Sequence, residues 1–168
     1  MDKMNCHLDM DYPAVQTSGQ NIYYASLLTQ DFAGAGGEMS AITQYFYQHL
    51  ITLNQHIEFA DSLKCISMVE MHHLDIIGQL IMLYGGDPQI KTVIPNRCHY
   101  WSSNHLSTTK TIQVFIRQNI ISETKAISAY KTRLKQLNDP LAQPIIERII
   151  MDEEHHIEIF ETWLKSFS

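Results

Sequence analysis

The sequence lacks the features that mark a membrane, secreted or nucleic-acid-binding protein. Its 168 residues contain no apolar run near the ~18 residues of a membrane-spanning helix. The N-terminal stretch MDKMNCHLDMDYP is too acidic and polar for a signal peptide, so a cytoplasmic protein is expected. Twelve basic residues face 18 acidic ones, and the basic residues form no cluster. The charge pattern therefore indicates neither nucleic acid nor an anionic membrane as a partner.

Cysteine, glycine and proline are also scarce. Cys6, Cys65 and Cys98 are odd in number and widely spaced, which predicts three reduced thiols rather than a disulfide framework or a Cys-x-x-Cys metal site. Seven glycines and five prolines gather in a few places, and most other segments repeat their apolar residues every three to four positions. With no break in composition, the chain is predicted to form one all-α domain.

The periodicity predicts four long helices, at about 22–53, 58–83, 110–137 and 141–167. Short connections make the first and second helices, and the third and fourth, antiparallel hairpins. The stretch 84–109 is long enough to cross from one end of a helix bundle to the other. We therefore expect an antiparallel four-helix bundle over 21–168, with a long crossover between the second and third helices and an N-terminal arm over 1–20. The glycines of AGAGGE in the first helix indicate a kink or close packing, or room beside Glu38.

The stretch MDEEHHIEIF at 151–160 breaks the rule that charges avoid a helix core. The apolar residues around it mark one helix face, and that face continues through Glu153 and His156. A buried charge costs several kcal/mol unless it is paired or bound. The pair therefore needs a partner.

The other three predicted helices break the rule in the same way. The second helix places Glu70 and His73 on its apolar face, the third Glu123 and the first Glu38. Within each hairpin the two glutamates lie 13 to 16 residues from the turn, so they are expected to meet at one level. The hairpins resemble two repeats, each with one Glu and one Glu-x-x-His.

Four inward carboxylates cannot all stay ionised without compensating charge. Two divalent cations would balance them, and mixed oxygen and imidazole ligands suit iron or manganese better than calcium. A zinc pair is possible, but a lone tetrahedral zinc site would not need six ligands. The sequence thus predicts a metal pair held by six residues: Glu38, Glu70, His73, Glu123, Glu153 and His156.

These residues resemble the ligand set of the ferritin-like di-metal carboxylate superfamily, which includes bacterioferritins, rubrerythrins and manganese catalases. EMSAITQYF at 38–46, EMHH at 70–73 and DEEHH at 152–156 are similar to bacterioferritin, and GGEMS at 36–40 is similar to manganese catalase. The resemblance implies terminal ligands at Glu38, Glu123, His73 and His156, and bridging carboxylates at Glu70 and Glu153. It also implies a tyrosine behind the ligands at Tyr45; a core tyrosine with a satisfied hydroxyl is the alternative.

Several family features are missing. Ala126 stands where rubrerythrins place an extra glutamate, and no Cys-x-x-Cys module follows, so a built-in electron relay is not expected. Met71 occupies the position of the haem-ligating methionine of bacterioferritins, but a packing role is favoured and haem is not expected. No fifth helix follows Phe167, which argues against a 24-subunit shell.

The expected function is redox chemistry on O2 or H2O2 at two iron ions, or alternatively two manganese ions, of the ferroxidase, peroxidase or catalase kind. Iron storage in a larger oligomer is the first alternative, and a structural module with an empty site is the second. A homodimer is expected, with the arm and the crossover covering apolar helix faces around Tyr23, Tyr24, Ile94, Tyr100 and Trp101.

Overall fold

The computed structural model describes residues 6–94 and 97–167. Five helices form most of this part of the chain, and the crossover adds a short hairpin and a 3-10 turn. The elements are α1 (Ile22–Ala33), α2 (Glu38–Thr52), α3 (Ile57–Leu83), β1 (Lys91–Ile94), β2 (Arg97–Tyr100), the turn Ser103–His105, α4 (Ile112–Gln136) and α5 (Gln143–Ser166). None of the described helices combines the length and apolar character needed to cross a lipid bilayer.

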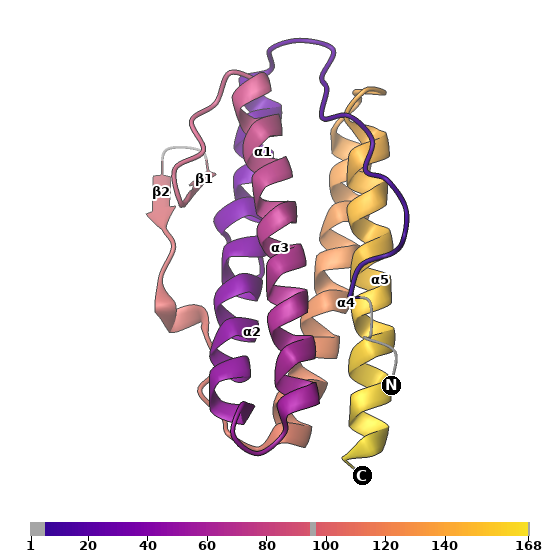
Figure 1. The fold of residues 1–168 in the computed structure, drawn as a ribbon. Coiled ribbons are helices and arrows are strands. Elements are labelled where there is room, and N and C mark those ends of the chain that lie inside the picture. Colours follow the sequence, from indigo (N-terminus) through magenta and orange to yellow (C-terminus); the bar gives the residue numbers. More distant parts are fainter. Residues whose placement is uncertain (1–5, 95–96, 168) are drawn as a thin grey trace.

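The helices form the predicted antiparallel bundle (Figure 1). Helices α2 and α3 make one hairpin and α4 and α5 the other, and the two hairpins lie side by side. Helix α1 continues the column of α2 toward the far end of the bundle. The fold class predicted from the sequence is confirmed, and the predicted boundaries of α3, α4 and α5 are correct to within two residues.

The predicted first helix is wrong in one respect, because it is two helices. Gly34 to Gly37 form a turn in which the Gly37 N–H donates to the Gly34 carbonyl. A side chain at Gly37 would place its Cβ 2.4 Å from the Asp31 carbonyl oxygen, so the turn closes only with glycine there. The break starts a new helix at Glu38, and Glu38 therefore lies in the first turn of α2.

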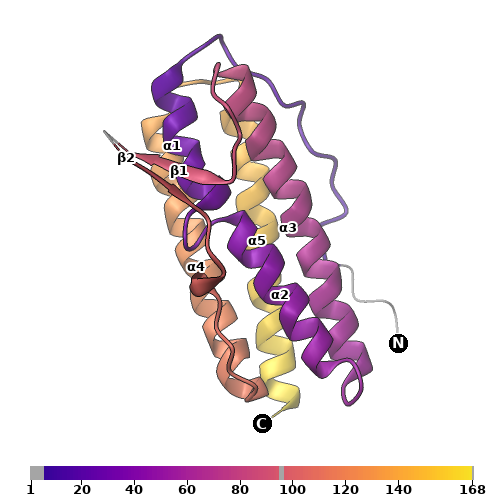
Figure 2. The ribbon, with the colours of Figure 1, turned by 90° about the vertical axis from the view of Figure 1, so that its left-hand side faces the viewer.

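The crossover passes from one end of the bundle to the other, as expected, but it contains an antiparallel hairpin that the sequence did not predict (Figure 2). Strand β1 pairs with β2 and lies against α1, where the Val93 N–H donates to Thr29 Oγ1 at 2.8 Å. Farther along, Trp101 Nε1 donates to Ser40 Oγ, and Gln44 exchanges two hydrogen bonds with the Ser107 backbone. These bonds fasten the crossover to α2.

The N-terminal arm runs along α5 before it crosses the end of the bundle to reach α1 (Figure 1). It brings Cys6 against α3, where Cys6 and Cys65 form a disulfide with their Cα atoms 5.9 Å apart. The prediction of three reduced thiols is therefore wrong; only Cys98 among them is free, and it is exposed. Sequence spacing could not show this pair, because the path of the arm brings together cysteines 59 residues apart.

Two apolar clusters fill the bundle, one toward each end. The first joins α1, the end of α3, the end of α4 and the start of α5, around Leu80 and Ile146. The second joins α2, the start of α3, the start of α4 and the end of α5, around Phe59 and Phe160. Glu38, Glu70, His73, Glu123, Glu153 and His156 lie between the two clusters, on α2, α3, α4 and α5.

Asp139, in the turn between α4 and α5, ties three segments together. Its carboxylate accepts hydrogen bonds from the Ser18 backbone and hydroxyl, from the Tyr84 hydroxyl and from the Leu141 N–H. Burial opposes its charged form, but these four donors lower the pKa of Asp139 below its usual value. The arm, the end of α3 and the second hairpin thus share one anionic acceptor.

Replacing Asp139 with alanine should lower the free energy of unfolding by about 1–3 kcal/mol, because it leaves buried donors without an acceptor. Urea unfolding at pH 7 measures the change. The exposed helix residue Asp61 provides the control, since Asp61→Ala should change stability by no more than about 0.5 kcal/mol. Equal effects of the two substitutions would contradict this role of Asp139.

Candidate metal centre

The structure brings the six residues selected from the sequence together in the middle of the bundle. Helices α2, α3, α4 and α5 each supply one glutamate or one Glu-x-x-His pair, and all six residues are at most 4% exposed. They are Glu38 from α2, Glu70 and His73 from α3, Glu123 from α4, and Glu153 and His156 from α5. The glycine break before α2, the lengths of the two hairpins and the registers of the helices therefore place all six side chains at the same depth in the bundle.

The six side chains divide into two groups that share two members. Glu38, Glu70, His73 and Glu153 form one group, and Glu70, Glu123, Glu153 and His156 form the other. Within each group the candidate ligand atoms lie within 4.8 Å of one another. Two cation positions thus emerge, with Glu70 and Glu153 common to both.

Each of the two shared carboxylates places one oxygen near His73 and its other oxygen near His156. Glu70 places Oε2 3.0 Å from His73 Nδ1 and Oε1 3.0 Å from His156 Nδ1. Glu153 places Oε1 3.3 Å from His73 Nδ1 and Oε2 3.1 Å from His156 Nδ1. A carboxylate that spans two positions in this way has the arrangement needed to bridge two ions.

The electrostatics of the cluster also fit cations. Burial and the neighbouring carboxylates raise the pKa of Glu38 and of Glu123 well above the usual value. Burial opposes the charged imidazoles, but hydrogen bonds and attraction from the carboxylates raise the pKa of His73 and His156. Glu70 Oε1 is buried without a well-directed hydrogen bond. In the metal-free protein, bound protons thus compensate the charge of the carboxylates, and divalent ions could replace these protons.

Both histidines have a partner on the side away from the carboxylates. His73 Nε2 donates to Asp152 Oδ2 at 3.2 Å, and His156 Nε2 donates to the Cys6 carbonyl oxygen at 3.1 Å. A proton held at Nε2 leaves the Nδ1 lone pair for a metal, and such outer partners fix the orientation of ligand imidazoles. The donor set therefore fits a pair of manganese or iron ions.

Two tyrosines hold the carboxylates that belong to one group only. The Tyr45 hydroxyl donates to Glu123 Oε1, and the Tyr130 hydroxyl donates to Glu38 Oε1. Burial and the nearby carboxylates raise the pKa of both phenols well above the usual value, so both remain protonated donors. Each tyrosine therefore links one hairpin to the other across the site.

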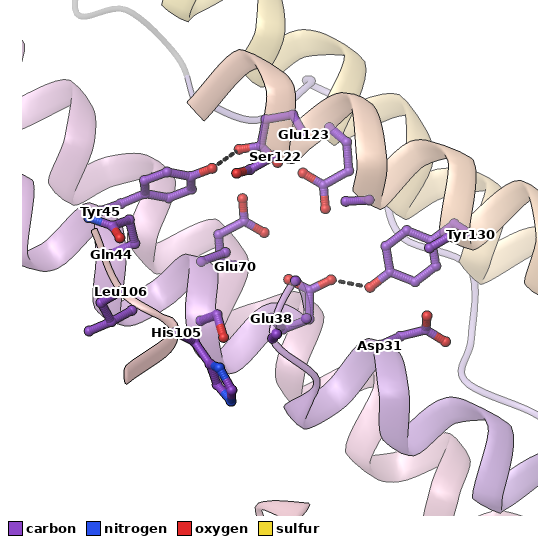
Figure 3. A pocket seen from close by; sticks show the side chains of 18 residues that line it. Asp31, Glu38, Gln44, Tyr45, Glu70, His105, Leu106, Ser122, Glu123 and Tyr130 are labelled. Carbon is purple, nitrogen blue, oxygen red and sulfur yellow. Dashed lines mark hydrogen bonds between the residues drawn. The ribbon is translucent and has the colours of Figure 1, made fainter. Parts of the chain in front are cut away.

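A cavity of about 80 Å³ reaches the carboxylates from one side (Figure 3). Glu38, Glu70 and Glu123 point into this space, with Tyr45 and Tyr130 on opposite sides of it. Small side chains line it, namely Gly36, Gly37, Ala41, Ser122, Ala126 and Ala129, and His105 and Leu106 of the crossover complete the wall. The carboxylate side is thus open to a small molecule, whereas the arm covers the histidine side.

Sequence reasoning missed three participants. Tyr130 follows Glu123 by seven residues, as Tyr45 follows Glu38, so the repeat of the hairpins contained the signal. Asp152 lies off the Glu153–His156 face and finds its partner on α3, and the Cys6 carbonyl comes from the arm. Periodicity along one helix could reveal neither of these two.

Met71 stands at the position of the haem-ligating methionine of bacterioferritins, and its side chain is 56% exposed on the surface of α3.

The conserved sequence pattern of manganese-containing catalases matches residues 7–93, slightly more than half of the chain. The chain belongs to this family. The matched stretch contains Glu38, Glu70 and His73 together with the arm from His7 onward. The part that carries Glu123, Glu153 and His156 follows it.

Individual relatives include a manganese catalase and several bacterioferritins. A probable manganese catalase of Clostridium acetobutylicum is 26% identical over 87% of this chain and 72% of its own length. The bacterioferritin of Brucella melitensis is 26% identical over 76% of this chain and 75% of its own. Two crystal structures show the same fold. The Anabaena manganese catalase KatB matches with a TM-score of 0.85 and 23% identity over 96% of this chain and 80% of its own. The Desulfovibrio desulfuricans bacterioferritin matches with a TM-score of 0.71 and 24% identity over 85% of this chain and 78% of its own.

We expect the metal-free protein to lose stability as the pH rises from 5 to 8.5. The pKa values of Glu38, Glu123, His73 and His156 are all raised on folding, so the folded protein binds more protons than the unfolded chain in this range. Each pKa unit corresponds to about 1.4 kcal/mol. Urea unfolding after chelation measures this dependence.

A double variant, Glu38→Gln with Glu123→Gln, serves as the control for the pH series, because it removes two of the four raised groups. Its stability should depend less on pH than that of the parent. Metal-free protein that becomes more stable between pH 5 and 8.5 would contradict the charge assignment.

Proposed function

We propose that the protein is a di-metal catalase that converts two molecules of H2O2 into O2 and two of water. Glu38, Glu70, His73, Glu123, Glu153 and His156 would hold two ions, manganese by family or alternatively iron. The observation that carries the proposal is the pair of ligand groups that share Glu70 and Glu153. The ions would supply the exchange of two electrons with each peroxide. Membership of the manganese-containing catalase family supports this choice of reaction.

The residues of the chain have separate tasks in this proposal. Glu70 and Glu153 would bridge, whereas Glu38 and Glu123 would each serve one ion and are steadied by Tyr130 and Tyr45. The Tyr130 hydroxyl donates to Glu38 Oε1. The other oxygen, Glu38 Oε2, lies 4.0 Å from His73 Nδ1 and would be the one that binds the ion. The imidazoles keep Nδ1 free for metal by holding their protons at Nε2.

The cavity suits a substrate the size of peroxide. It leaves about 80 Å³ beside the carboxylates, and small residues form much of its wall. Disproportionation also needs no outside electron donor, because one peroxide reduces the other.

Iron oxidation and storage is the second candidate, because bacterioferritins are among the relatives and share the fold. A shell that stores iron needs many subunits, whereas we propose that this protein forms a homodimer. Tyr23 and Tyr100, on α1 and β2, are 59% and 68% exposed and would be covered in it. Light scattering decides between them: a mass near two chains supports the enzyme, and a mass near 24 chains that takes up hundreds of irons supports storage.

Replacing the bridging carboxylate should remove both metals. Glu153→Gln is expected to bind fewer than one ion per chain after loading with Mn²⁺, whereas Glu38→Gln should retain about one. Glu154→Gln is the matched control, because Glu154 is the exposed neighbour and pairs with Lys131 on the surface; it should bind two ions. A Glu153→Gln protein with two ions would refute the bridging role.

Oxygen evolution tests the activity directly. Manganese-loaded protein should release one O2 for every two H2O2 consumed, and Glu153→Gln should lose at least about 100-fold in rate, because a site without its metal pair lacks the reacting ions. Glu154→Gln should keep the parent rate. Two bound ions with no oxygen release under manganese or iron loading would overturn the catalase proposal while leaving the metal site intact.

A further inference from the structure

The N-terminal arm supplies none of the candidate ligands, but it contacts the residues behind both histidines. Its residues 6–12 lie over the histidine side, where they provide the acceptor of one imidazole and contact the acceptor of the other. The Cys6 carbonyl accepts from His156 Nε2. The Leu8 N–H and the Tyr12 hydroxyl both donate to Asp152, the acceptor of His73 Nε2.

Arg148 on α5 receives the arm. Its guanidinium donates to the Leu8 and Met10 carbonyls at 3.1 and 3.2 Å and lies 4.3 Å from the centre of the Tyr12 ring. The same guanidinium lies 2.6 Å from Asp152 Oδ1, and both residues are buried. The arm, Arg148 and Asp152 therefore form one connected network behind His73.

The disulfide acts on the other histidine. Cys6 carries both the sulfur bonded to Cys65 and the carbonyl that accepts from His156. Cys65 lies on α3, five residues before Glu70 on the same helix. The covalent bond thus fixes the acceptor of one candidate ligand to the helix that supplies two others.

We propose that residues 6–12 are a positioning part of the metal centre, and that the Cys6–Cys65 disulfide keeps the Cys6 carbonyl in place to orient His156. The inference rests on the proposed metal site. With the disulfide open, this carbonyl is held by the noncovalent contacts of Leu8, Met10 and Tyr12 with Arg148 and Asp152. His156 then loses a fixed acceptor, and the ion on its side is bound less tightly.

The proposed substrate can close this tether. Two thiols give up two electrons and two protons to one H2O2, which forms the S–S bond and two molecules of water. A water-soluble phosphine reverses the step: the two sulfurs take up two electrons and two protons as thiols, and the phosphine becomes its oxide with oxygen from water. Retention of the metal should therefore depend on the state of the disulfide.

The test follows the loss of Mn²⁺ to excess chelator from the full-length, manganese-loaded protein, with and without the phosphine. Reduction should accelerate loss about tenfold, which is the usual scale for removing the outer partner of a ligand histidine. Cys65→Ser should lose metal at the faster rate under both conditions. Cys98→Ser is the matched control, because Cys98 is exposed and unpaired, and it should behave as the parent does.

Electron paramagnetic resonance separates positioning from general loosening of the fold. The ion on the His156 side should leave first, so the spectrum should pass from a coupled Mn²⁺ pair to an isolated Mn²⁺. Removing the phosphine and reoxidising the reduced protein should restore slow loss. The measurements are made well below the unfolding temperature of each variant.

Equal rates of loss for the parent, the reduced parent and Cys65→Ser would overturn the inference, as would simultaneous loss of both ions. Failure of the parent protein to bind two ions at all would instead refute the proposed metal site itself. The two failures are therefore distinguishable.

Discussion

Four carboxylates buried at one level of a helix bundle are the constraint on which this structure depends. Glu38, Glu70, Glu123 and Glu153 lie between two apolar clusters, where unpaired charges would cost several kcal/mol each. The chain offers two imidazoles inside the cluster and two tyrosine hydroxyls at its edges, but four carboxylates still exceed two imidazolium charges. A pair of divalent ions removes this excess, and the apolar clusters on both sides confine them to that level.

The parts around this layer each serve one of its faces. The break at Gly34–Gly37 starts α2 at Glu38 and gives the cavity small walls, and the crossover closes the rim of that cavity with His105 and Leu106. The histidine face is sealed by the arm, Asp152 and Arg148. A centre that is open on its carboxylate side and closed on its histidine side can admit a small oxidant while its imidazoles stay fixed.

The sequence predicted what each helix encodes by itself and missed what only long-range contacts create. Glu70 with His73, and Glu153 with His156, were found because three-residue spacing on an apolar face is a local signal, and short turns transfer depth from one helix to its neighbour. Cys6–Cys65 and the pairing of Asp152 with His73 depend on the path of the arm and on packing between helices. The crossover hairpin escaped because its short strands have no core of their own, and exposed Arg97 and His99 give no alternating pattern.

Diffraction from manganese-loaded crystals at the manganese absorption edge tests the central claim most directly. The account predicts two anomalous peaks per chain, about 3.5–4 Å apart as in other two-metal centres, with Glu70 and Glu153 between them. One peak should lie beside His73 and Glu38, and the other beside His156 and Glu123. A single peak within the cluster, or ions bound only elsewhere on the chain, would contradict it.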